Sequence, residues 1–79
     1  MVLKEAIAKR IKEELIKRNI SQYKLSQISG VPQSTITTIL NYDIKTIKLN
    51  TLYDICSGLG IELKDFFDTE YFKLENLDD

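Results

Sequence analysis

Residues 20–40 constrain the fold of this chain more than any other segment, because their pattern predicts two short helices joined by a tight turn. Ser21 can cap the first helix, since its hydroxyl can accept from a backbone N–H two or three residues further on. Gly30 can end that helix in the left-handed conformation that a helix C-terminus often requires. Pro32 suits the opening of the second helix, where its missing N–H has no partner to lose.

The two predicted helices differ in what they present to solvent. Leu25 and Ile28 are expected on one apolar face of the first, and the second repeats apolar residues at the spacing of a core-facing stripe: Ile36, Ile39 and Leu40. Opposite that stripe lie small hydrogen-bonding residues without charge: Gln33, Ser34, Thr37 and Thr38. Uncharged donors and acceptors suit contact with base edges in a DNA major groove, so this face predicts DNA recognition.

Size and composition exclude most other chemistry. A chain of 79 residues is one small domain that buries only about 60% of its unfolded surface. It has no histidine and one cysteine, so one chain cannot form a disulfide, a Cys/His zinc cluster or a Cys–His nucleophile. Cys56 is expected to be buried in packing. The acidic residues Asp43, Asp54 and Asp65 lack metal-loop spacing, and we expect no enzyme, metal or cofactor.

The first ten residues and the apolar runs bear on location. The start is charged and amphipathic, unlike a signal peptide, and no apolar run approaches the ~18 residues of a membrane span. We therefore expect a reduced, cytoplasmic protein that does not enter a membrane.

The net charge of −1 hides an asymmetry along the chain. Residues 1–50 carry nine Lys or Arg against four Asp or Glu, whereas residues 51–79 carry two against eight. A basic half is typical of a polyanion-binding protein, and an acidic half limits indiscriminate binding. Solvated helix faces are the alternative explanation, because pairs such as Glu5–Lys9 and Glu13–Lys17 also support a helix.

The whole chain predicts an all-α fold of five helices, at residues 2–18, 21–29, 32–40, about 49–57 and roughly 62–67. A polar, basic loop of about eight residues follows the third helix. Residues 1–68 are expected to form the domain and residues 69–79 an acidic C-terminal tail. The expected core beyond the central pair of helices is Leu3, Ala6, Ile7, Ile11, Leu15, Ile16, Leu49, Leu52, Ile55, Cys56, Leu63, Phe66 and Phe67.

Two stretches, SQYKLSQISGVPQSTI and LNTLYDICSGLGIELKDFF, carry a resemblance to a known family. Over residues 3–68 the chain resembles the Cro/CI-type (phage-repressor-like, XRE-type) helix-turn-helix family. The resemblance implies a five-helix lambda-repressor-like domain that binds double-stranded DNA, usually as a homodimer that regulates or represses transcription.

By position, the resemblance also implies roles for individual residues. Base contacts fall to Gln33, Ser34 and Thr38, with Thr37 alongside, and a glutamine can bond adenine N6 and N7 together. Phosphate contacts fall to Gln22, Thr35 and Asn41, with Lys45 and Lys48 reaching from the loop.

The chain departs from the family pattern at two places. Members commonly join an arginine of the first helix to a glutamate of the third in a buried ion pair, and here those positions hold Leu15 and Leu40. We expect these leucines to meet in the core, since an apolar pair can match an ion pair in stability. Second, the glycine that often follows the third helix is absent, and Asn41-Tyr42-Asp43 stands there instead.

Two functions from different classes remain open. The first is a sequence-specific DNA-binding transcriptional regulator, which we expect to act as a repressor and to form a homodimer through its C-terminal third. The alternative is an antitoxin or adaptor whose main partner is a protein bound through the C-terminal segment. The apolar residues available to either interface are Phe66, Phe67, Tyr71, Phe72, Leu74 and Leu77, unless they complete the monomer core.

Overall fold

The computed structural model describes residues 1–79 and contains helices but no strand. The five α-helices are α1 (Leu3–Arg18), α2 (Gln22–Ser29), α3 (Gln33–Leu40), α4 (Leu49–Leu59) and α5 (Leu63–Phe67). Two short 3₁₀ turns follow, η1 (Glu70–Phe72) and η2 (Leu74–Asn76). The expected all-α, five-helix fold is confirmed, and the helices lie within two residues of the expected bounds. No helix is long and apolar enough to cross a membrane.

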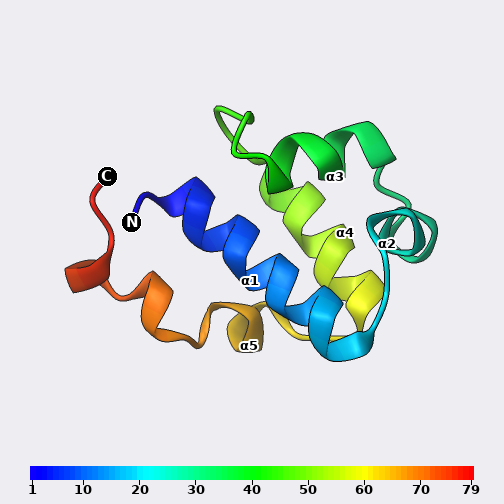
Figure 1. Cartoon of the computed structure of the whole chain (residues 1–79). Helices are drawn as coiled ribbons and strands as arrows, with labels where there is room; N and C mark the ends of the chain where they lie inside the picture. The colour runs from blue at the N-terminus through cyan, green and yellow to red at the C-terminus, as the bar shows by residue number, and fades with distance from the viewer.

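The helices pack around one core. α2 lies against α4, and α1 lies along α3, while α5 lies beside the middle of α1, near Arg10 (Figure 1). Leu15 and Leu40, the two leucines at the family's ion-pair positions, are both buried in that core, at 8% and 2% exposed. The core cluster is Ile7, Ala8, Ile11, Leu15, Leu25, Val31, Ile36, Ile39, Leu40, Leu52, Ile55, Cys56, Leu59 and Phe66.

The local signals around the central turn act as the sequence predicts. The Ser21 side chain accepts from the Lys24 N–H at 3.0 Å and caps α2. Gly30 ends α2 with φ +76°, in the left-handed region. Pro32 stands at the N-cap of α3, and its carbonyl accepts from the Ile36 N–H. These contacts set the turn between α2 and α3.

Two glycines lie near the end of α4, and the structure assigns them different roles. Gly60 ends the helix with φ +74°. Gly58 stays inside it, where a Cβ would lie 2.8 Å from Ser29 Cα. Gly58 therefore lets α4 approach the backbone at the end of α2 more closely than any side chain would allow.

Four residues expected in the core are exposed instead. Ile16 is 80% exposed, Leu49 65%, Leu3 41% and Ile28 39%. Ile16 lies about 100° around the helix from Leu15, on a side of α1 that no other element covers. Leu3 and Leu49 belong to the first turns of their helices, which extend beyond the neighbouring helix. Spacing alone overestimated the width of these apolar stripes.

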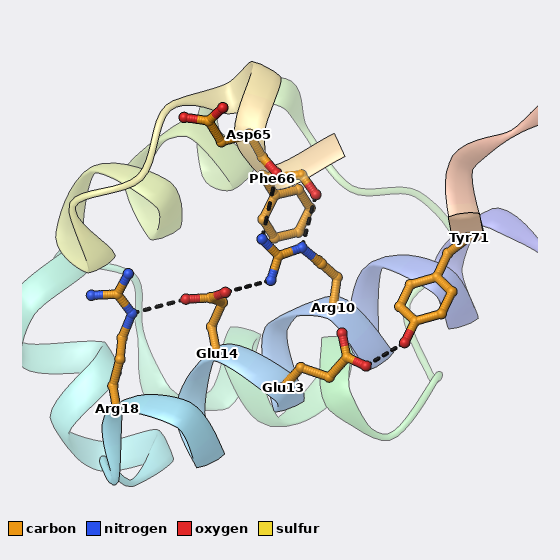
Figure 2. Close-up of polar contacts among 7 residues, drawn as sticks. All are labelled: Arg10, Glu13, Glu14, Arg18, Asp65, Phe66 and Tyr71. Atoms are coloured by element: carbon orange, nitrogen blue, oxygen red, sulfur yellow. Dashed lines mark hydrogen bonds and ion pairs between the residues drawn. The ribbon is translucent and has the colours of Figure 1, made fainter. Parts of the chain in front are cut away.

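A charged residue of α1 is buried where the sequence analysis predicted none. Glu14 is 4% exposed and accepts from Arg10 at 2.5 Å and from Arg18 at 2.9 Å (Figure 2). Arg10 also donates to the carbonyl oxygens of Phe66 and Asp65 in α5. Burial opposes ionisation of Glu14, but the hydrogen bonds from the two arginines outweigh it and lower the pKa of the carboxyl. This cluster ties α1 to α5.

The C-terminal residues fold back along α1. The Phe72 ring packs against Phe66 and Phe67, with its centroid 5.9 Å from that of Phe66 and 4.9 Å from that of Phe67. Tyr71 donates to the Glu13 carboxylate (Figure 2), and the Leu3 N–H donates to Asp79. Phe66 is fully buried, so it offers no surface to a partner. Part of the apolar C-terminal set completes the monomer core.

Candidate nucleic-acid interface

The exposed side of α3 carries the residues that the sequence predicted for base contact. Ile36, Ile39 and Leu40 are at most 2% exposed. Gln33 and Ser34, in the first turn, are exposed, whereas Thr37 and Thr38 are half-buried. Because the apolar stripe holds α3 against α1 and α2, its polar side faces solvent as one surface.

Two of these polar side chains already have partners within the chain. The Thr38 hydroxyl donates to the Ser34 carbonyl oxygen at 2.8 Å, one turn earlier. The Thr37 hydroxyl donates to Oε1 of Gln22 at 3.2 Å. This second bond joins the start of α2 to α3, so Thr37 braces the two helices together. The Gln33 side chain and the Ser34 hydroxyl make no hydrogen bond within the chain and are free to meet a ligand.

The start of α2 presents donors to solvent. Gln22 is the first residue of the helix, and the bond from Thr37 engages its oxygen, leaving the two hydrogens of Nε2 without a partner in the chain. Backbone N–H groups at a helix N-terminus favour an anion, because the helix dipole is positive there. Thr35 lies half-buried in α3, and Asn41 is exposed at its C-terminal end.

The loop of residues 41–48 takes a defined path between α3 and α4. The half-buried side chains of Ile44 and Ile47 pack against the core. Lys45 and Lys48 are exposed, as a phosphate contact from the loop requires. Lys45 also borders a groove of about 550 Å³ between the loop and the start of α1, where Lys4 is a second cation. The sequence analysis did not single out Lys4.

Tyr42 takes the backbone conformation that a glycine after α3 would adopt. Tyr42 occupies the left-handed region with φ +63°, and its ring lies beside Lys12 of α1. Neither residue was a predicted site residue. No local signal could have paired them, because they are thirty residues apart in the chain.

The one cysteine is buried as expected, at 1% exposed, and burial raises the pKa of the Cys56 thiol to about 11. At neutral pH the thiol is therefore protonated and serves packing. No three His, Cys, Asp or Glu side chains are grouped so that they could hold a metal ion.

Comparison with known proteins identifies a family over most of the chain. Residues 10–71 match the family model of the Cro/C1-type HTH DNA-binding domain. The match includes the turn between α2 and α3, the polar side of α3 and the loop that follows. No curated protein and no solved structure matches the chain.

Proposed function

Because the chain belongs to the Cro/C1-type HTH DNA-binding domain family, we propose that it is a sequence-specific transcriptional regulator that represses by occupying its DNA site. The main support for this proposal is the surface of α3, whose apolar stripe is buried while Gln33 and Ser34 face solvent. In this mechanism α3 enters the major groove, and its side chains meet base edges. Bound protein then blocks polymerase.

Four side chains of α3 form the proposed base-contacting set, three directly and Thr37 through Gln22. Gln33 can bond adenine N6 and N7 together, and its amide has no competing partner in the chain. Ser34 can donate to or accept from either base of a pair. Thr38 donates its hydroxyl hydrogen to the Ser34 carbonyl, so it meets DNA through a lone pair or its methyl group. Thr37 holds Gln22 and contributes through that residue.

The phosphate contacts flank this surface. The free Nε2 hydrogens of Gln22 and the nearby N-terminal amides of α2 suit one phosphate. Thr35, Asn41, Lys45 and Lys48 complete the proposed set, with the two lysines supplying charge from the loop.

A homodimer would place two copies of α3 in successive major grooves, about 34 Å apart. We place its interface on the C-terminal third, where Leu49, Tyr53 and Leu74 are 65%, 56% and 91% exposed. Large exposed apolar side chains are typical of interaction surfaces. An adaptor or antitoxin could use the same surface for another protein, and the experiment below separates these functions.

The test is selection of bound sequences from random duplex DNA by the full chain. We expect one enriched motif arranged as an inverted repeat, which would report specificity and two-fold symmetry together. Gln33→Ala should weaken binding to that motif by about 1–3 kcal/mol and relax one base position in each half-site. A chain that enriches no duplex, yet retains a defined protein from a lysate, would favour the adaptor function. An unchanged base profile in the variant would remove Gln33 from base recognition.

A further inference from the structure

The end of α3 places a large side chain in a backbone conformation that favours glycine. The Asp43 N–H donates to the Thr38 carbonyl at 3.0 Å, and the Tyr42 N–H donates to the Ile39 carbonyl at 3.2 Å. This pair of bonds closes a helix with a left-handed residue at the position of Tyr42, which has φ +63°. Glycine takes that conformation without a steric penalty, whereas a residue with a bulky side chain rarely does.

The Tyr42 side chain is held by α1. Lys12 Nζ lies 4.7 Å from the centroid of the Tyr42 ring and 3.4 Å from its hydroxyl oxygen. An ammonium group has donors and no acceptor, so the phenol oxygen accepts from Lys12. The phenol hydrogen is then left without a partner, because Tyr42 donates to no acceptor of the chain. Tyr42 is 40% exposed, and this hydrogen can therefore meet an external group.

The pair stands at the edge of the α3 surface. Tyr42 directly follows Asn41, which caps the C-terminus of α3 and belongs to the proposed interface. It comes four residues after Thr38. The pair offers one phenol donor and one ammonium, and the phenol oxygen already accepts from Lys12. A phosphate oxygen is the ligand that matches such a pair, because it accepts hydrogen bonds and carries negative charge.

We propose that Tyr42 and Lys12 together bind a backbone phosphate of the DNA that α3 contacts, extending the proposed interface onto α1. This inference rests on the proposed function. It gives a reason for a tyrosine at a position that glycine would occupy with less strain: the side chain contributes to binding at the expense of stability.

The test compares duplex binding and thermal unfolding for Tyr42→Phe, Tyr42→Gly and Lys12→Gln in the full chain, using the duplex selected by the wild-type protein. Tyr42→Phe removes only the hydroxyl and should weaken binding about three- to tenfold, the range for one hydrogen bond. Tyr42→Gly should weaken binding at least as much while its unfolding midpoint stays equal or rises, because the strain is relieved. Lys12→Gln should flatten the slope of log K against log salt by about 0.9.

A matched variant controls for the loss of a lysine charge from α1. Lys9→Gln alters a lysine that lies over the Tyr71 ring beside the C-terminal turns. It should leave affinity and salt slope unchanged. Since one phosphate contact carries no sequence information, the three test variants should keep the base profile of the wild type.

The outcomes separate this inference from the proposed function. If the wild-type protein binds a selected duplex and Tyr42→Gly binds it equally well or better, the phosphate site is overturned while the regulator function stands. A Lys12→Gln variant with an unchanged salt slope overturns it as well. If the wild-type protein binds no duplex at all, the proposed function and the phosphate site fail together.

Discussion

At the scale of single residues, Glu14 shows how a charge is kept in a small core. Its carboxylate accepts from two arginines of the same helix, and Arg10 extends the cluster to the backbone of α5 (Figure 2). The family's ion pair between α1 and α3 is replaced here by leucines. The buried carboxylate of this chain instead pairs with arginines of its own helix, and α5 contributes only carbonyl oxygens to Arg10.

Glu14→Gln should lower the free energy of unfolding at pH 7 by about 1–3 kcal/mol, because a neutral amide leaves both arginines with weaker partners. In the folded protein the pKa of Glu14 lies below its ordinary value of 4.5. Its stabilising contribution is therefore complete above pH 4.5 and is lost as the pH falls through the lower, folded pKa. Urea unfolding at a series of pH values measures this difference.

The wild-type and variant proteins should differ by a constant amount from pH 7 down to about pH 5, and should converge in more acidic solution. Glu75→Gln is the matched control, since that carboxylate is exposed and makes no ion pair. A difference between wild type and Glu14→Gln that grows as the pH falls would contradict this account.

At the scale of elements, the contact between α2 and α4 positions the proposed DNA-contacting surface. α2 carries Gln22 at its start. The other end of α2 packs so closely on Gly58 of α4 that a side chain at position 58 would not fit. The neighbouring atoms at Ser29 and Ile28 belong to the backbone, which cannot move aside as a flexible side chain can. The position of the entire helix pair therefore depends on one missing Cβ.

Gly58→Ala should destabilise the fold by about 1–3 kcal/mol, although alanine is the better helix former, because α4 must shift away from α2. Thermal and urea unfolding measure this effect. Ser57→Ala, one residue earlier on an exposed part of α4, should change stability by less than about 0.5 kcal/mol. A Gly58→Ala variant as stable as the wild type would show that the helices can separate without cost.

At the scale of the whole molecule, residues 69–79 bring the C-terminus into contact with the N-terminus. The two termini lie side by side (Figure 1). The Asp78 N–H donates to the Met1 carbonyl, and Phe72 completes the aromatic cluster with Phe66 and Phe67. Leu74 makes no such contribution, at 91% exposed. The C-terminal segment thus has a packed part near Phe72 and an exposed part beyond it.

Two nested truncations test where the folded unit ends. A chain of residues 1–72 keeps Phe72 and should lose little stability, whereas residues 1–68 lose that ring and should be less stable by about a further 1–3 kcal/mol. Calorimetric unfolding of both chains beside the full-length protein measures the difference. Equal unfolding midpoints for the two truncated chains would support a domain boundary at residue 68, as the sequence first predicted.

The sequence by itself determined the helices, the turn between α2 and α3 and the two faces of α3. Each depends on interactions within about four residues, such as the Ser21 cap and the left-handed Gly30. The same local periodicity predicted that Gln33 and Ser34 lie opposite the buried Ile36, which is why the main candidate contacts could be named in advance.

Tertiary structure alone decided which apolar residues are covered and which distant side chains meet. Ile16 and Leu49 are exposed because no neighbouring element reaches them. Lys12 meets Tyr42, and Gly58 meets Ser29, across separations of about thirty residues. Such contacts depend on how rigid helices are placed by the whole core, and a pattern that repeats every 3.6 residues contains no information about that placement.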